Sequence, residues 1–385
     1  MVSLTVFFAV LAVLSGFAFV YPYLIYPLVL KLLPNRPVEV IADRNATASL
    51  EVALLFCAYN EEAALPDKLE NLRMIKSEMP RLQIYAYSDC STDSTNALLT
   101  RASGLLTPVF GDERVGKVLG MQRLVEIAEA DILVFSDANV MIEPGSLTRL
   151  IEYFSDPDIG AVAATLIYDD AVDGSASVTA HVGSLYWRLE EHIKQMESKT
   201  GSMMGADGAF FARRRIGYPI VPPHLVDDMI VSLGVLFKGM RCVSAPDVFG
   251  IENLVTSRAE EFRRKRRIAC GSYSTYQFMR RDLRRLGIKD RFKFFSHKLL
   301  RWWGAFFLSG SVLFTIIALI TAGSGLPAII GIAVGILFFV LLGMRNAPLI
   351  APLYEVVLAV LATGIGVAES LAGSRYQIWD PAKTR

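Results

Sequence analysis

The chain has 385 residues, of which 53% are hydrophobic and 20% are charged, and its 39 lysines and arginines nearly balance 38 aspartates and glutamates. This composition excludes an intrinsically disordered chain and a small disulfide-stabilised secreted domain. Long uncharged runs lie toward both ends and most charges lie between them, which is typical of a membrane protein with one soluble domain. The four cysteines have no CxxC spacing, so we expect reduced thiols in the cytosol.

The first predicted element is a transmembrane segment at residues 1–30. Val2–Leu30 contains no charged residue, and about twenty helical residues are enough to cross a hydrocarbon layer of roughly 30 Å. A signal peptide is the alternative interpretation, but such peptides begin with basic residues and have a shorter apolar stretch. Residues 1–5 contain no lysine or arginine, which favours a membrane span.

Residues 40–290 are predicted to form one α/β domain with a mostly parallel sheet, because short β-rich runs alternate with longer helical runs. Each β-rich run is apolar enough for a sheet that is covered on both faces. The predicted strands are residues 52–58, 83–87, 131–136, 160–167, 208–212 and 241–244. The predicted helices are residues 61–78, 92–103, 118–130, 185–196 and 228–238.

Polar residues follow the first three predicted strands. They are Tyr59-Asn60-Glu61-Glu62, the run from Ser88 to Asp93, and Asp137-Ala138-Asn139. In open α/β sheets the ligand binds at the carboxyl ends of the strands, so these three turns predict a binding site at one edge. Asp, Ser and Thr are also common helix caps, which is an equally good interpretation for residues 91–93. Asp137 has no obvious helix to cap.

Residues 111–117 (GDERVGK) fit the GxxxxGK part of a phosphate-binding P-loop, and residues 131–137 resemble the strand and aspartate that hold magnesium in such ATPases. The match fails at Val118, because the motif needs a hydroxyl there as a Mg²⁺ ligand. Lys117 remains a candidate phosphate contact, with a solvated lysine at a helix start as the alternative.

Seven motifs in order resemble the membrane-bound inverting glycosyltransferases of family 2, which include cellulose, chitin and hyaluronan synthases. They are CAYNEE (57–62), SDCSTD (88–93), GK (116–117), SDAN (136–139), GADGAFFARR (205–214), VDDM (226–229) and RRKRRI (263–268). The resemblance implies a GT-A domain with flanking transmembrane helices. It also implies transfer of a sugar from a nucleotide-sugar donor, expected to be UDP-linked, to a polysaccharide, oligosaccharide or lipid-linked acceptor in cell-envelope or exopolysaccharide synthesis.

Carried over by position, the resemblance also implies roles for single residues. Tyr59, Asn60 and Glu62 would lie in the nucleotide-sugar motif, and Asp89 would contact the uridine. The donor pyrophosphate would be bound by Lys117 and Arg267, with Mg²⁺ or Mn²⁺ held by Asp137 and Asn139. Asp207 and Gly208 would lie near the acceptor. Asp228 would be the catalytic base, and we expect the neighbouring Asp227 to satisfy the start of its helix instead.

The sequence departs from the family pattern at three positions. Asn139 replaces the second carboxylate of the DxD motif, so the expected cation would be held mainly by Asp137 and the donor. Ser88 replaces the first acidic residue of the DDGS motif. Ile268 replaces a tryptophan that stacks on the acceptor sugar in the synthases, and this makes processive polymer synthesis an open alternative to transfer onto a short or lipid-linked acceptor.

The C-terminal part is predicted to contain a basic interfacial segment at 291–301, a transmembrane region of about three segments at 302–372 and a tail at 373–385. Fifteen basic residues and four acidic ones lie in residues 258–301. Basic residues flank membrane spans on the cytoplasmic side, so we expect the central domain in the cytoplasm, the N-terminus outside and a location in the plasma membrane. The basic excess is expected to face anionic lipid of the bilayer rather than nucleic acid.

Four spans would place the C-terminus outside, yet Arg375, Lys383 and Arg385 favour the inside, so a re-entrant last segment is the alternative. Within that segment Glu355 is costly in lipid and is expected to face other helices or a polar path. Partner subunits in the membrane remain possible in this scheme. The distant alternatives to a glycosyltransferase are a P-loop ATPase and a non-catalytic membrane sensor.

Overall fold

The computed structural model describes residues 2–38, 40, 47, 49–169, 178–253 and 257–378. Its strands are β1 (Val52–Ala58), β2 (Gln83–Ser88), β3 (Thr107–Phe110), β4 (Ile132–Ser136), β5 (Met141–Ile142), β6 (Ile159–Asp169), β7 (Phe210–Arg214) and β8 (Arg241–Asn253). The helices of the central part are α3 (Leu65–Glu78), α4 (Thr95–Arg101), α5 (Lys117–Ile127), α6 (Ser146–Glu152), α7 (Val178–Lys199), α8 (Asp227–Leu233), α9 (Arg258–Leu283) and α10 (Ile288–Phe294). The apolar helices are α1 (Val2–Leu30), α12 (Gly304–Thr321), α13 (Gly325–Met344) and α14 (Ala351–Leu371), and the short α11 (Leu300–Trp302) precedes α12.

The eight described strands form one sheet in the order β3-β2-β1-β4-β7-β6-β8-β5. β7 is antiparallel to β4 and β6, and β5 is antiparallel to β8, whereas all other neighbours are parallel. The predicted α/β class and mostly parallel sheet are therefore confirmed. The carboxyl ends of β1, β2 and β4 meet at one rim, as the sequence predicts.

Side chains of β1 alternate between two cores, because successive strand residues point to opposite faces of the sheet. Leu54 and Phe56 pack with the helices α3, α4 and α6 on one face. Ala53 and Leu55 pack with α5, α8 and α9 on the other face. The second core continues into Trp302, at the end of α11, so the sheet domain and the base of the apolar helices share buried surface.

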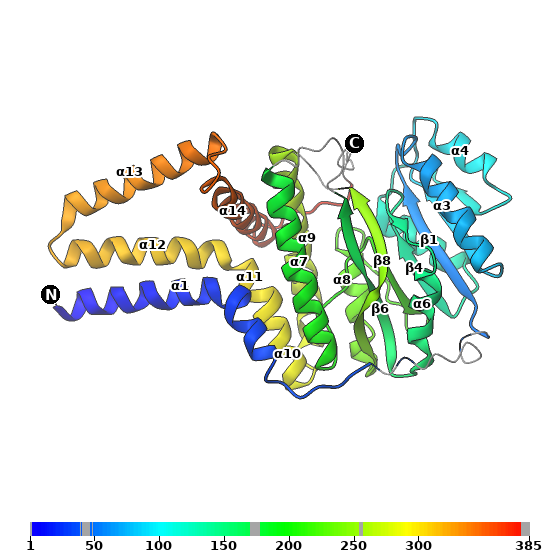
Figure 1. Cartoon of the computed structure of the whole chain (residues 1–385), viewed down its shortest axis with the longest axis horizontal. Coiled ribbons are helices and arrows are strands. Elements are labelled where there is room, and N and C mark those ends of the chain that lie inside the picture. Colours follow the sequence, from blue (N-terminus) through cyan, green and yellow to red (C-terminus); the bar gives the residue numbers. More distant parts are fainter. Residues whose placement is uncertain are drawn as a thin grey trace.

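Four of the described helices are long and apolar enough to cross a membrane, and they correspond to α1, α12, α13 and α14. In Figure 1, α1, α12 and α13 extend away from the sheet, whereas α14 lies between α13 and α9. α1 and α12 run side by side in opposite directions: Thr5 donates a hydrogen bond to Thr321, and Ser311 donates to the carbonyl of Ala12, both over 3.0 Å.

α14 differs from the other three apolar helices because it packs along α9. Two ion pairs, Arg258 with Glu355 and Arg266 with Glu369, join the two helices. The hydroxyls of Ser274 and Ser370 lie 2.7 Å apart. Glu355 thus faces another helix, as expected from the sequence, and its partner is an arginine of the soluble domain.

The described part of the tail, residues 373–378, returns to the sheet domain. Cys270 of α9 donates to the carbonyl of Ser374. A Cβ atom on Gly116 would lie 2.7 Å from the carbonyl oxygen of Gln377, so the tail passes directly beside the start of α5. The remaining predicted tail residues, 379–385 with Lys383 and Arg385, lie outside the described residues.

A buried polar cluster connects α1 to α7 and to the π-helical turn Phe295–Leu299. The ring nitrogens of His297 lie 2.9 Å from Glu190 and 2.9 Å from Glu197, and the Tyr26 hydroxyl donates to Glu197 over 2.5 Å. Lys298 contacts Glu190 over 3.1 Å, so each buried carboxylate has partners. Because buried charges are costly without partners, the cluster fixes the first apolar helix against the domain.

Candidate active site

The turn after β4 carries Asp137 and Asn139, and hydrogen bonds from a buried lysine stabilise it. Lys68 of α3 is fully buried and donates to the Ser136 hydroxyl over 2.8 Å and to the Val140 carbonyl over 2.6 Å. Burial lowers the pKa of Lys68 to about 7. These bonds fix both ends of the turn, so the position of Asp137 at the rim is determined by a lysine that no sequence motif contains.

Lys117, the first residue of α5, pairs with Asp137. Its Nζ lies 2.5 Å from Asp137 Oδ1 and 3.4 Å from the carbonyl oxygen of Gly208. Burial alone would lower the pKa of Lys117, but Asp137, Asp227 and Asp228 together raise it, so the ammonium stays charged. The lysine is therefore a fixed positive charge among carboxylates, and the solvated-lysine interpretation does not describe it.

Asp228 lies in the first turn of α8, close to Gly208. A Cβ atom on Gly208 would lie 2.7 Å from Asp228 Oδ2, so a side chain at this position would displace the carboxylate. Burial raises the pKa of Asp228 to about 7, with Asp227 adding to the rise and Lys117 opposing it. A carboxylate with a pKa near neutrality is suited to act as a general base.

The expectation that Asp227 caps α8 needs correction. The N-cap residue is Val226, with extended dihedral angles and no side-chain cap, and its own N–H donates to the Thr275 hydroxyl over 2.9 Å. Asp227 and Asp228 both lie in the first helical turn, where the helix dipole favours negative charge. α9 thus anchors the start of α8, which leaves both carboxylates available to the rim.

Asp89 follows β2 and binds the loop that precedes α5. Its carboxylate oxygens accept the N–H groups of Val115 over 2.8 Å and of Gly116 over 2.9 Å. A P-loop binds phosphate through backbone N–H groups of the same kind, and here a carboxylate already occupies them. Together with Val118, this argues against the ATPase alternative, and Asp89 positions Lys117 through the loop.

Asn60 and Glu62 bind the loop between β2 and α4. Asn60 Oδ1 accepts the Thr92 N–H over 2.8 Å, and Glu62 Oε2 accepts the Ser94 N–H over 3.0 Å. Tyr59 lies under the guanidinium of Arg114, whose central carbon is 3.5 Å from the ring centroid. The residues of the CAYNEE motif therefore form one side of the rim together with the loop between β2 and α4.

Asp207 lies on the opposite side of the rim, in the loop before β7. It pairs with Lys194 of α7 over 2.5 Å, and Lys194 also contacts Glu191 over 3.1 Å. The side chain of Lys194 is only 3% exposed, so α7 fixes Asp207 firmly. Arg267 of α9 interacts electrostatically with Asp137; burial, with Arg264 alongside, lowers its pKa to about 10, which leaves it charged at neutral pH.

The structure thus brings Lys117, Asp137, Asp207, Gly208 and Asp228 together, with Arg267 nearby. Lys68, Lys194 and Glu252 lie outside the sequence motifs that predict the site. Glu252 of β8 accepts a hydrogen bond from Asn139, and burial raises its pKa to about 7 while Arg264 opposes the rise. A carboxylate beside Asn139 is the feature that sequence spacing alone did not indicate.

The residues at the turn fit a divalent cation only in part. The Asp137 carboxylate and the Asn139 amide are hard oxygen donors, which suit Mg²⁺ or Mn²⁺. Among the residues that the structure describes, no three carboxylate, imidazole or thiol side chains are close enough to hold a metal ion. The donor set therefore fits a cation that also takes oxygens from a bound diphosphate.

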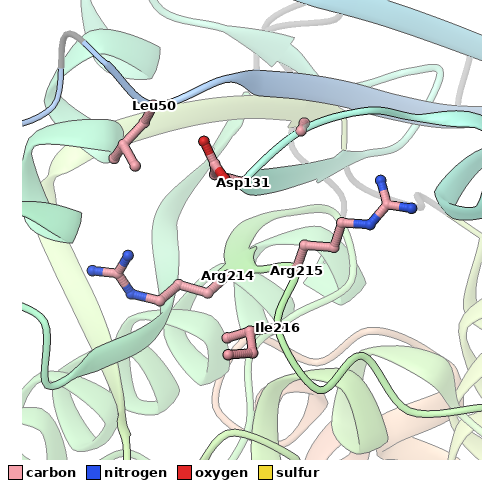
Figure 2. Close-up of a pocket in the computed structure, with 6 residues that line it drawn as sticks. Leu50, Asp131, Arg214, Arg215 and Ile216 are labelled. Carbon is pink, nitrogen blue, oxygen red and sulfur yellow. The ribbon is translucent and has the colours of Figure 1, made fainter.

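A surface pocket lies at the opposite end of the strands. It is lined by Leu50, Ala130, Asp131 and the run from Arg214 to Ile216, and Figure 2 shows these side chains. Arg214 donates to the carbonyl oxygens of Phe154 and Ile159, so it ties neighbouring segments together. The residues of the rim do not line this pocket, which we do not assign to the site.

Comparisons with known proteins agree with this arrangement. Residues 54–218 match the model of the glycosyl transferase family 2. No curated protein sequence matches the chain. A mannosyltransferase from Pyrobaculum calidifontis, solved with GDP-Man and Mn²⁺, superposes with a TM-score of 0.71 at 19% identity over 94% of this chain and 99% of that one.

A second solved structure, S. aureus TarS, covers 68% of this chain and 43% of its own at 14% identity and a TM-score of 0.42. That likeness is too low to support an argument. The family match covers β1 to the end of β7, which includes Asp89, Lys117 and Asp137, and the mannosyltransferase has the same fold over nearly the whole chain. Residues 54–218 therefore match a glycosyltransferase family 2 domain, within an α/β sheet of the GT-A fold that apolar helices flank.

Proposed function

We propose that this chain is a membrane-bound inverting glycosyltransferase that moves a sugar from a nucleotide-sugar donor to a lipid-linked or carbohydrate acceptor. The observation that carries the proposal is the convergence of Asp137, Lys117 and Asp228 at the rim. Lys117 contacts Asp137 directly, and its other contact, Gly208, lies against Asp228. A base and a diphosphate-binding charge therefore lie within one small region.

In the proposed reaction an acceptor hydroxyl attacks the anomeric carbon while the bond from that carbon to the diphosphate oxygen breaks. Asp228 takes the hydroxyl proton, and the nucleoside diphosphate leaves with the bonding electron pair. A positioned base of this kind contributes about 10²–10⁴ to the rate. Attack from the side opposite the leaving group inverts the anomeric configuration, so an α-linked donor gives a β-linked product.

On the donor side, Lys117 and Arg267 supply positive charge for the diphosphate. Arginine offers a fork of N–H donors that matches phosphate oxygens, and lysine acts as a point charge. Asp137 and Asn139 are the residues that would hold Mg²⁺ or Mn²⁺, and the cation would neutralise charge on the departing diphosphate. Asp89 holds the loop that precedes Lys117. The stacked side chains of Tyr59 and Arg114 offer a flat surface for the nucleobase of the donor.

On the acceptor side, we favour a lipid-linked or short acceptor over a growing polymer. Ile268 is exposed at the position where the synthases carry the stacking tryptophan. The apolar helices α1, α12 and α13 extend from one side of the domain, which suits an acceptor that stays in the bilayer (Figure 1). Processive synthesis would instead give product chains of increasing length, which separation of the products by size would show.

We propose three membrane spans, α1, α12 and α13, in the plasma membrane, with the central domain in the cytoplasm. α14 is apolar, but ion pairs and a hydroxyl pair bind it along α9 of the domain. Three spans with the N-terminus outside place the C-terminus inside. This agrees with the basic residues of the tail and with the position of Gln377 beside Gly116.

The proposal is tested with the full chain purified in detergent. Nucleotide release is measured with UDP-, GDP- and dTDP-linked sugars, with Mn²⁺, with Mg²⁺ and with EDTA. We expect turnover with one donor class in the presence of a divalent cation. Asp228→Asn is expected to lower the rate by about 10²–10⁴ and to leave donor binding nearly unchanged, because the amide cannot accept the proton.

The matched control is Asp67→Asn, the same change at an exposed aspartate of α3. It should keep the wild-type rate. Equal turnover by Asp228→Asn and the control would remove the base assignment. Hydrolysis of ATP in place of sugar transfer would revive the P-loop interpretation.

A further inference from the structure

Glu252 lies on β8 directly beside the turn that carries Asp137 and Asn139. β5 and β8 are antiparallel, with Met141 opposite Ile251 and Ile142 opposite Gly250. The next residue along β8 is Glu252, which the register therefore places next to the residues just before β5. On its other side Glu252 pairs with Tyr168 of β6, so the strand is held from both edges.

The side chain of Glu252 is half-buried and interacts with the turn itself. Its carboxylate accepts a hydrogen bond from the amide of Asn139. Asp137, Lys117 and Arg264 are the other charged groups that act on this carboxylate. Glu252 thus belongs electrostatically to the rim of the sheet, although it lies about a hundred residues beyond the turn in sequence.

The hydrogen bond determines the orientation of the Asn139 amide. A carboxylate only accepts hydrogen bonds, so the NH₂ group of the amide must face Glu252. The amide oxygen is then directed away from Glu252 and is available to a cation. Without this partner the amide could rotate by half a turn and present N–H groups, which repel a cation.

Glu252 also supplies charge that the turn lacks. A turn with two aspartates offers a divalent cation two negative charges, whereas Asp137 and Asn139 offer one. Hydrogen-bonded partners behind a metal ligand fix its orientation and raise its affinity, and their loss typically costs 10–100-fold in metal affinity. The Glu252 carboxylate would both orient the Asn139 amide and add negative charge near the cation.

We propose that Glu252 is a positioning residue that completes the divalent-cation site by orienting the Asn139 amide and by supplying the second negative charge. The inference rests on the proposed function only for the assignment of Asp137 and Asn139 as cation ligands. A purely structural role, in which Glu252 simply joins β8 to Arg264 of α9, is the competing explanation.

The test measures Mn²⁺ binding to the full chain in detergent by electron paramagnetic resonance of free Mn²⁺, with UDP or GDP present to supply diphosphate oxygens and without a sugar donor or acceptor. Glu252→Gln is expected to weaken Mn²⁺ affinity by about 10–100-fold. Glu129→Gln, the same change at an exposed glutamate near the far end of α5, is the control and should bind as the wild type does. Melting temperatures verify that each variant is folded.

The combined variant N139D/E252Q exchanges the two groups. It restores the total charge and reverses the hydrogen bond, since the glutamine amide now donates to the aspartate. We expect its Mn²⁺ affinity to return close to the wild-type value, because the turn regains its second negative charge. Glu252→Asp, which keeps the charge but withdraws it from Asn139, should bind more weakly than the wild type and replaces the glutamine variant if that one does not fold.

Three results would overturn the inference: wild-type affinity in Glu252→Gln and Glu252→Asp, no recovery in the exchanged variant, or no Mn²⁺ binding by the wild type. Because binding is measured without a sugar donor or acceptor, failure of the proposed sugar transfer leaves the result for Glu252 standing. If the Glu252 variants bound Mn²⁺ as the wild type does while sugar transfer was observed, only the inference on Glu252 would fail.

Discussion

Asp227 and Asp228 are consecutive carboxylates in the first turn of α8, and the charge of Asp227 affects the protonation of Asp228. Burial and the charge of Asp227 raise the pKa of Asp228 to about 7, while Lys117 lowers it. A base works only when it has lost its proton, so the rate should fall as the pH decreases below about 7. Above that pH Asp228 is ionised, and its ionisation should no longer change the rate.

Asp227→Asn gives a test at the residue scale. Removing a negative charge beside an acid makes its ionised form easier to reach, so the pKa of Asp228 should fall. We expect Asp227→Asn to remain active and to shift the acidic limb of the kcat/KM profile to lower pH, as measured by initial rates from about pH 5 to about pH 9. A limb that stays in place would contradict the influence of Asp227 on the pKa of Asp228, whereas an inactive Asp227→Asn would indicate that Asp227 is the base instead.

At the scale of elements, the sequence predicted six of the eight described strands and located the rim that carries Asp89, Asp137 and Lys117. It missed β3, which contains Pro108 at the sheet edge where proline is tolerated, and β5, which has only two residues. The predicted last strand stopped at residue 244, before Pro246 and Asp247, which are typical breakers. β8 continues past them through an irregularity in its pairing with β6, and this continuation is what brings Glu252 to the site.

The contacts within the site were not predictable, because they join residues far apart in sequence. Hydrophobic alternation locates a strand and its rim, but it does not say which lysine meets which carboxylate. The pair Lys117–Asp137 and the support of the turn by Lys68 arise only when α3 and α5 pack on opposite faces of the sheet. The family resemblance predicted that Lys117 and Asp137 belong to the site, but their ion pair could be recognised only in the folded structure.

The packing of α14 on α9 gives a prediction at the same scale. Gly366 lies against the backbone of Arg266 and Cys270, with no room for a side chain. Gly366→Leu should force the helices apart and destabilise the protein by about 1–3 kcal/mol, seen as a lower melting temperature in detergent. Gly331→Leu is the matched control in α13, where nothing lies within 4 Å of the added Cβ atom.

Equal melting temperatures for the two leucine variants would contradict the close packing of α14 on α9. The experiment also has a functional readout, because α9 carries Arg267 and anchors α8 through Thr275. We therefore expect Gly366→Leu, and not Gly331→Leu, to lose transfer activity along with stability.

At the scale of the whole molecule, the arrangement of the apolar helices implies a topology. Thr5 at the start of α1 bonds to Thr321 at the end of α12, so these two ends lie on the same side. In the proposed topology the basic residues that follow α1 and precede α12 lie on the cytoplasmic side, which would put Thr5 and the turn at Gly323-Ser324 outside. α13 would then return to the cytoplasmic side, where the proposal places α14, the tail and the sheet domain.

Cysteine labelling in intact cells tests this topology. The four native cysteines all belong to the central domain, and a membrane-impermeant thiol reagent should not reach them. Ser324→Cys should react in intact cells, because its position in the turn between α12 and α13 is exposed and outside. Ser374→Cys, just after α14, should react only after the membrane is permeabilised. If Ser374→Cys reacted in intact cells as readily as Ser324→Cys, α14 would span the bilayer, and its ion pairs with α9 would have to break in the membrane.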